Sequence, residues 1–204
     1  MKRILCIVLA VLTALCVAAC GSAGAPAPTA QPGGLEADKL SEFVDVVYFT
    51  HYASGGTAEE YPAIILMEES NSTFTCYQVA YSGCTCRDSM ANYYSVVYVE
   101  LLNTKPSGDE AAIRSITMAD NKGLWGDSNP NYYIAEYTQE YMDEHFLQPL
   151  VGVTKAEFDA WQGYGTQIDA IEADAVSGAT VSTGNLTSML RSLLAYHAEK
   201  YYQN

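Results

Sequence analysis

The chain has few basic residues: 10 Lys and Arg stand against 24 Asp and Glu in 204 residues, a formal net charge of −14. Lys2 and Arg3 are the only charged side chains in the first 19 residues, so the remainder is more acidic still. An acidic surface repels nucleic acid and anionic lipid headgroups. We therefore expect no nucleic-acid partner, and any attachment to a membrane must come from something other than a basic patch.

Patterns that mark metal sites or self-contained catalysis are also missing. His51, His145 and His197 are scattered, and none lies at a spacing typical of metal ligands. No Ser/His/Asp arrangement is discernible, and no phosphate loop ends in Gly-Lys-Ser/Thr. Acidic pairs such as Glu68–Glu69 are typical of a solvated surface. We expect no metal site.

Residues 4–17, "ILCIVLAVLTALCV", form an apolar run that is too short to predict a membrane-spanning helix. Lys2 and Arg3 precede it and "VAAC" follows, ending at Cys20, a pattern that resembles a bacterial lipobox. The resemblance implies a lipoprotein signal peptide over 1–19, lipidation of Cys20, and anchoring at the extracytoplasmic face of the cell membrane. The alternative is an ordinary secretory signal with an incidental cysteine. Residues 20–35, rich in Gly, Ala and Pro, then predict a flexible linker.

Three cysteines remain beyond Cys20: Cys76, Cys84 and Cys86. An odd number outside the cytoplasm indicates one disulfide with a free thiol, or no disulfide. One interpretation is a structural bridge from Cys76 to Cys84 or Cys86. Another is a redox role for the Cys84-x-Cys86 pair, with Arg87 nearby to favour a thiolate.

The first half of the remaining chain predicts strands. Five segments rich in β-branched and aromatic residues are separated by short turns, which indicates hairpins of a mainly antiparallel sheet. They are "VVYFTHY" from Val46, "AIILMEE" from Ala63, "TFTCYQVAY" from Thr73, "YYSVVYVELL" from Tyr93 and "AAIRSITM" from Ala111.

The second half predicts helices. "TQEYMDEHFLQPL" from Thr138 has a helical pattern that Pro149 should end. Thr154 and Glu157 form a capping box. A long helix is expected from about Ser182 to Tyr202, with one apolar face made of Leu186, Met189, Leu190, Leu193, Leu194 and His197. Strands followed by helices indicate an α+β fold, with helices packed against one sheet.

The stretch "DAVSGATVST", Asp174 to Thr183, comes directly before and into this last helix. Ser182 or Thr183 can cap the helix, and Gly178 and Ala179 let the backbone approach a ligand closely. A helix N-terminus with unpaired amides is a site for an anion such as a phosphate. The physics alone equally allows a capped helix after a glycine turn.

The same stretch matches the flavinylation motif of the FMN-binding domain family, which includes the flavin subunits of the Rnf and Na⁺-translocating NADH:quinone reductase complexes. That motif is Asp, two residues, Ser or Thr, Gly, then Ala-Thr, and Asp174, Ser177, Gly178, Ala179 and Thr180 fill its places. The resemblance implies that residues 36–204 form an FMN-binding domain. It also implies that a flavin transferase joins FMN through its phosphate to the Thr180 hydroxyl.

A second segment resembles the family less closely. In the Rnf and quinone reductase subunits a strand ends in Glu-Thr-Pro-Gly-Leu-Gly, near the flavin. Here "AAIRSITM" leads into "ADNKGLWGD", where Asp120, Gly123 and Leu124 hold matching places and Trp125 replaces the last glycine. Trp125 is either a ring that stacks on the isoalloxazine or a partly buried loop anchor.

Together these features predict a membrane-anchored extracytoplasmic electron-transfer flavoprotein with covalent FMN. The expected partners are a flavin transferase for maturation and a membrane redox partner as electron donor. Two alternatives remain: a lipoprotein that binds a small molecule or a partner without flavin, and an FMN-dependent extracytoplasmic reductase.

Overall fold

Five strands form one antiparallel sheet in which neighbours in sequence are neighbours in space. They are β1 (Val46–Tyr52), β2 (Ala58–Ser70), β3 (Phe74–Ser82), β4 (Tyr94–Leu102) and β5 (Ile113–Met118). This computed structural model describes residues 44–53, 55–83, 94–119, 138–169 and 180–203, all within one compact unit, Asp38–Asn204. The five strands expected from the sequence are thus confirmed, and β1 has the expected bounds.

All the described helical elements but one follow the sheet in sequence, and the predicted α+β class is confirmed. A short 3-10 turn, η1 (Gly108–Glu110), precedes β5. After it come α3 (Gln139–Met142), the π-type turn η2 (Asp143–Leu147), the 3-10 turn η3 (Gln148–Leu150), α4 (Lys155–Ala160) and α5 (Thr180–Tyr201). α4 begins at the predicted capping box, in which the Thr154 side chain binds the Glu157 backbone and the Glu157 side chain binds the Thr154 backbone.

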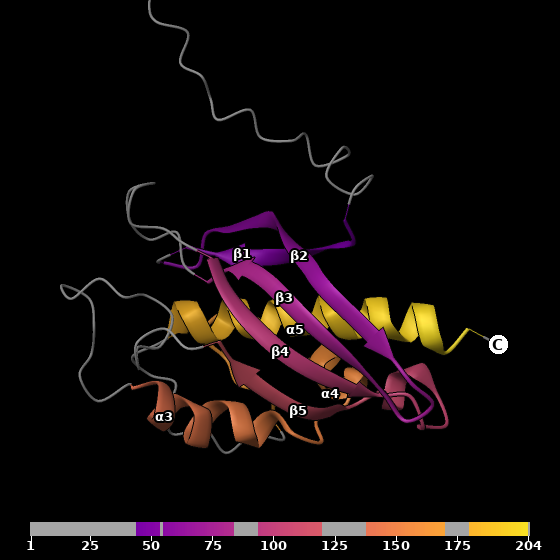
Figure 1. Cartoon of the computed structure of the whole chain (residues 1–204). Helices are drawn as coiled ribbons and strands as arrows, with labels where there is room; N and C mark the ends of the chain where they lie inside the picture. The colour runs from indigo at the N-terminus through magenta and orange to yellow at the C-terminus, as the bar shows by residue number, and fades with distance from the viewer. Residues whose placement is uncertain (1–43, 54, 84–93, 120–137, 170–179, 204) are drawn as a thin grey trace, which may run out of the picture. The chain divides into compact units, whose positions relative to one another are not determined.

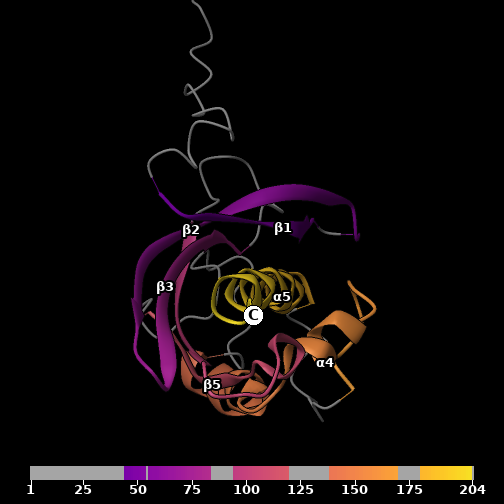
Figure 2. The ribbon, with the colours of Figure 1, turned by 90° about the vertical axis from the view of Figure 1, so that its right-hand side faces the viewer.

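The 22-residue helix α5 lies along the concave face of the sheet (Figure 1). Figure 2 looks almost along its axis and shows β1, β2, β3 and β5 curving around it, with α4 on the remaining side. Residues 183–190 are therefore buried without a break. A helix surrounded in this way needs apolar or hydrogen-bonded side chains on every face.

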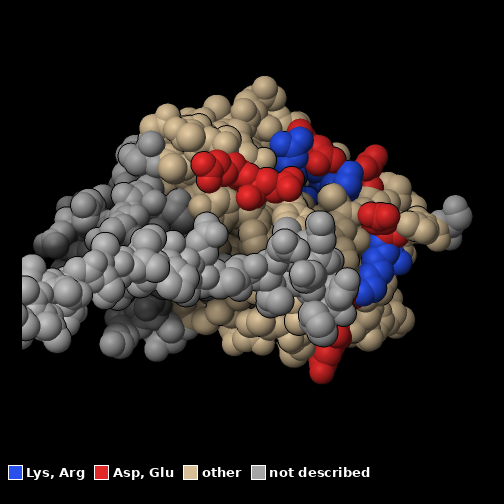
Figure 3. Space-filling view, turned by 90° about the horizontal axis from the view of Figure 1, so that it is seen from above, with Lys and Arg blue, Asp and Glu red and all other residues tan. Residues whose placement is uncertain are grey.

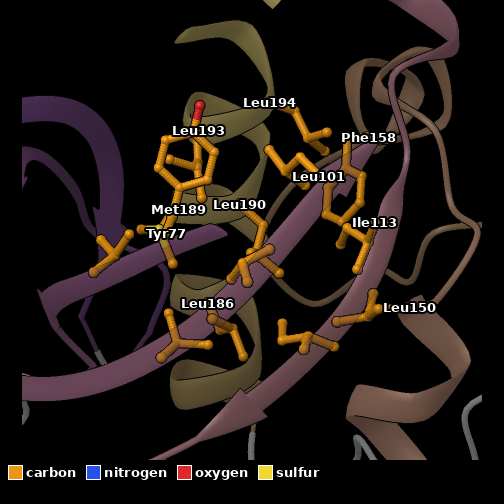
Figure 4. Close-up of a cluster of buried hydrophobic side chains, with 14 of the residues drawn as sticks. Tyr77, Leu101, Ile113, Leu150, Phe158, Leu186, Met189, Leu190, Leu193 and Leu194 are labelled. Atoms are coloured by element: carbon orange, nitrogen blue, oxygen red, sulfur yellow. The ribbon is translucent and has the colours of Figure 1, made fainter. Parts of the chain in front are cut away.

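The core forms where α5 meets the inward side chains of the strands. Figure 4 shows Leu186, Met189, Leu190, Leu193 and Leu194 of α5 against side chains of the sheet and of α4. All five are fully buried, as the predicted apolar face requires. Their partners in the cluster include Tyr77, Leu101, Ile113, Leu150 and Phe158. Each such side chain contributes roughly 1.5–3 kcal/mol by leaving water.

His197 completes the apolar face of α5 and is fully buried with both ring nitrogens in use. Its Nε2 lies 3.2 Å from the Leu102 carbonyl oxygen, to which it donates. Its Nδ1 then accepts from the Tyr77 hydroxyl at 2.9 Å. Burial lowers the pKa of His197, which favours the neutral ring that this pattern needs. His197 is therefore a packing residue, as its position in the sequence indicated.

Four basic side chains on the described surface are paired with acids, and the exposed Lys105 has no ion pair among the described residues. Arg114 pairs with Glu100, Lys155 with Asp109 and Asp159, Arg191 with Asp159, and Lys200 with Glu68. Figure 3 shows basic side chains next to acidic neighbours on one face of the molecule. Acidic side chains outnumber basic ones, so this surface keeps a net negative charge after these pairs have formed.

Glu68 anchors the carboxyl end of α5 to β2. Its carboxylate accepts from the hydroxyls of Tyr196 (2.9 Å) and Tyr201 and from Lys200 Nζ (2.9 Å), and its side chain is only 11% exposed. Burial raises the pKa of Glu68, but the hydrogen bonds from Tyr201, Lys200 and Tyr196 outweigh it, so the net shift is downward. The folded protein thus favours the ionised form of Glu68.

We expect Glu68→Gln to lower the free energy of unfolding by about 1–3 kcal/mol at pH 7. Because folding lowers the pKa of Glu68, its contribution is present above the unfolded value of 4.5 and is lost as pH falls below it. Urea unfolding from pH 7 to pH 3 should show the difference between wild type and variant shrinking. The exposed neighbour Glu69→Gln is the control, and a difference that grows in acid would contradict this account.

Candidate functional site at the amino end of α5

Residues that flank the segments 84–93, 120–137 and 170–179 lie at the same end of the sheet. Ser82 at the end of β3 pairs with Tyr94 at the start of β4, on either side of 84–93. Met118 at the end of β5 accepts at its carbonyl from Gln139 Nε2 (3.3 Å), on either side of 120–137. α5 begins near the same end, directly after 170–179. The segments that carry Cys84-x-Cys86, the residues from Asp120 to Trp125, and the motif from Asp174 to Thr180 are therefore each joined to described residues at this end of the sheet.

Asn185 joins α5 to two strands at this end. Its Oδ1 accepts from the Tyr52 backbone N–H at 2.6 Å, and its Nδ2 donates to the carbonyl oxygens of Tyr52 and Gly83, both at 3.0 Å. The amide thus pairs with the open edge of β1 much as a further strand would. Asn185 is completely buried, so these bonds fix the amino end of α5 against β1 and β3.

Pro62 explains why the pairing between β2 and β3 ends before the start of β2. β1 pairs with β2 as far as Tyr52↔Ala58, but β2 pairs with β3 only from Ile64↔Ala80 onward. Proline has no N–H to donate to a neighbouring strand, so the ladder between β2 and β3 stops short of Pro62. The start of β2 is thereby free to follow β1 and not β3.

His51 lies on β1 one residue before Tyr52. Along this strand Val47, Phe49 and His51 are buried in alternation, so they share the inward face that α5 covers. The His51 ring stacks on Tyr61 with centroids 4.4 Å apart and meets Phe49 edge-on at 6.2 Å. Only 2% of His51 is exposed, and burial lowers its pKa, which favours a neutral ring.

The Nε2 atom of His51 has no hydrogen-bond partner, and it is the single buried side-chain polar atom of this kind in the described residues. A buried polar atom without a partner costs about 1–3 kcal/mol relative to a paired one. Native proteins keep few such atoms, and each calls for an explanation.

Aromatic rings lie at the end of β1 and against the loop that follows it. Tyr52 lies 5.5 Å from Tyr164 and meets Trp161 edge-on at 6.2 Å, measured between ring centroids. A Cβ atom on Gly56 would lie 3.1 Å from the Tyr164 ring, and its φ of +81° also favours glycine. Gly56 therefore lets the β1–β2 turn lie against this ring.

The predicted motif residues are only partly described. α5 begins at Thr180, whose side chain is outside the described set, and Ser182 is half-buried in the first turn. The prediction that Ser182 or Thr183 caps the helix is wrong, because the helix starts before both and Thr183 is buried within it. Several predicted residues lie outside the described residues: Cys20, Cys84, Cys86, Asp120, Gly123, Leu124, Trp125, Asp174, Ser177, Gly178 and Ala179.

Cys76 is a free, half-buried thiol on β3. Six residues of strand, about 20 Å, separate it from Ser82. Cys84 follows Ser82 by two residues, about 7 Å of chain, and bridged cysteines have Cα atoms within about 7 Å. The length of β3 thus argues against a Cys76–Cys84 bridge, and Cys76 is free in the structure, so the predicted structural bridge from Cys76 is not found.

We expect Cys76 to be alkylated without prior reduction, and slowly at neutral pH. Burial, followed by the charges of Glu100 and Glu69, raises the pKa of this thiol and so lowers the thiolate fraction. Iodoacetamide labelling followed by peptide mass spectrometry measures the rate. The rate should rise with pH and increase in Glu100→Gln at fixed pH. A Cys76 recovered in a disulfide-linked peptide would contradict the prediction.

Within the described ranges, no three His, Cys, Asp or Glu side chains are grouped to hold a metal ion. No helix among the residues that the structure describes is long and apolar enough to cross a membrane. Searches of family models, curated proteins and solved structures found no match to this chain.

Two residues of this site were not singled out from the sequence. His51 stood out only as one of three scattered histidines, and no motif pointed to Asn185. Nothing near His51 in the sequence indicates that its ring is buried without a partner.

Proposed function

We propose that this chain is a membrane-anchored extracytoplasmic electron-transfer flavoprotein that carries FMN on Thr180 through a phosphoester. The observation that carries the proposal is the coincidence of the motif with the fold: Thr180, its last residue, is the first residue of a 22-residue helix. The positive end of a long helix dipole stabilises a nearby negative charge by typically 0.3–1 kcal/mol. A phosphodiester on Thr180 would keep such a charge in that position.

The described residues at this end of the sheet fit a bound flavin. They offer aromatic side chains, Tyr52, Tyr61 and Tyr164, and a buried imidazole nitrogen that lacks a partner. When bound, the flavin supplies the redox chemistry. The chain's own part is to hold the helix start rigidly, which Asn185 does, and to keep water from the inward face of β1.

The anchor and linker suit an electron carrier that meets partners at a membrane. Lipidation of Cys20, as the lipobox resemblance implies, would attach the domain to the extracytoplasmic face. A flexible linker over 20–35 then raises the effective concentration of the domain near a membrane redox partner. In this proposal that partner is the electron donor, and a flavin transferase acts once, during maturation.

The proposal is tested by producing the protein with and without a flavin transferase, then denaturing and desalting it. Covalent FMN survives this treatment, so the co-produced protein should keep flavin absorbance and the other should not. A colourless co-produced protein would favour a flavin-free binding lipoprotein. A coloured protein that turns over a small substrate without a protein partner would favour the reductase alternative.

A further inference from the structure

We propose that His51 is the side chain that hydrogen-bonds the isoalloxazine ring of the flavin, an inference that rests on the proposed function. The inference starts from the Nε2 atom of His51, which has no hydrogen-bond partner although only 2% of the residue is exposed. A partner that the described residues do not provide is what a ligand would supply.

The position of His51 places it beside the start of α5. Asn185 holds the backbone of Tyr52, the next residue, through both N–H and carbonyl. Asn185 follows Thr180 by five residues, about 7.5 Å along the helix axis. His51 faces inward on β1, toward the helix. The ribityl chain of FMN separates ring from phosphate, so the ring of an FMN attached through Thr180 need not lie at Thr180 itself.

The surroundings of His51 favour a flat heterocycle over a phosphate as the partner. Tyr61 stacks on the imidazole at 4.4 Å and Phe49 meets its edge, so the nitrogen lies among aromatic carbon. Burial in such surroundings keeps the imidazole neutral. A neutral N–H matches a ring carbonyl or ring nitrogen, whereas a phosphodiester is best held by charge or by several amides.

Positioning of the imidazole is built into the strand pairing. Phe49 pairs with Tyr61 across β1 and β2, and His51 pairs with Glu59, so Tyr61 and His51 lie on the same face two residues apart. The stacked Tyr61 ring fixes the plane of the imidazole. It therefore also fixes the direction in which Nε2 points, and a rigid donor loses little entropy on binding.

Nitrogen NMR of the histidine rings tests the proposal on intact protein. The chain has only three histidines, and the His51 resonances are assigned by their loss in His51→Gln. Spectra are compared for wild type made with and without the flavin transferase, with FMN content measured by intact mass. We expect the His51 Nε2 resonance to shift on loading while those of His145 and His197 stay in place. An unchanged His51 signal in protein that mass shows to be loaded would overturn the inference.

The midpoint potential gives a second readout. A hydrogen bond from Nε2–H to the ring stabilises added negative charge, so His51→Phe should lower the potential. We expect at least a tenfold change in the two-electron reduction equilibrium, which corresponds to about 30 mV. His51→Gln, which keeps an N–H donor, should change it less.

His145 is the matched control. Its ring also stacks on a tyrosine, Tyr141 at 4.1 Å, but its Nδ1 bonds the Tyr141 carbonyl oxygen at 2.9 Å. His145→Phe should leave the potential unchanged. Equal midpoint potentials in loaded wild type and loaded His51→Phe would overturn the role given to His51 but would not affect the proposed function. A wild-type chain that never gains FMN overturns the proposed function, and this inference with it.

Discussion

Thr180→Ala should abolish covalent flavin. Alanine keeps the helix-forming character of the position but removes the hydroxyl to which the phosphate would be joined. Protein produced with the flavin transferase should lose essentially all flavin fluorescence in a denaturing gel, whereas Thr180→Ser, which keeps a hydroxyl, should retain some. The effect is expected to be all or none because a phosphoester cannot form without that oxygen.

Ser182→Ala is the matched control for this loss. Ser182 is half-buried in the first turn of α5 and is the nearest described hydroxyl that could serve as an alternative acceptor, since only 1% of Thr183 is exposed. We expect Ser182→Ala to load normally. Flavin retained by Thr180→Ala, or lost from Ser182→Ala alone, would place the attachment elsewhere.

Asn185→Ala should be among the most destabilising polar substitutions in the described part of the chain. It leaves the Tyr52 N–H, the Tyr52 carbonyl and the Gly83 carbonyl without their buried partner, and it opens a small cavity. We expect a loss of about 3 kcal/mol in the free energy of unfolding, measured by urea denaturation of the flavin-free domain.

Asn185→Asp separates hydrogen bonding from size. The carboxylate can still accept from Tyr52 N–H, but its second oxygen would face two carbonyl oxygens, and a buried charge would lack a partner. It should therefore destabilise at neutral pH and recover in acid, where a protonated carboxyl can donate. The control is Gln78→Ala, whose amide donates to the Tyr98 hydroxyl at the surface and should cost less than about 0.5 kcal/mol. Equal effects of Asn185→Ala and Gln78→Ala would contradict the role given to Asn185.

The sequence predicted local structure where the cause is local. β1 and the capping box at Thr154 follow from side-chain alternation and from residues three apart, so both were found. β2 begins at Ala58, five residues earlier than expected, because residues 58–62 contain no β-branched side chain and yet pair with β1. The predicted helix from Thr138 is instead a series of α, π and 3-10 turns that changes at Asp143, well before Pro149.

The candidate site depends on contacts between residues far apart in the chain, which no local pattern contains. Asn185 meets Tyr52 and Gly83 across 133 and 102 positions. The orphaned nitrogen of His51 arises only once β1, β2 and α5 are packed together. The motif predicted the start of α5 within two residues, but its chemistry comes from the family resemblance and not from the spacing of its hydroxyls.

The central claim is one FMN bound covalently to Thr180, and the most direct measurement is mass spectrometry of the protein matured with a flavin transferase. The account predicts an intact mass raised by one FMN less one water, and fragmentation that places the addition on the peptide's Thr180. An unchanged mass, or an addition on a different residue, would contradict it.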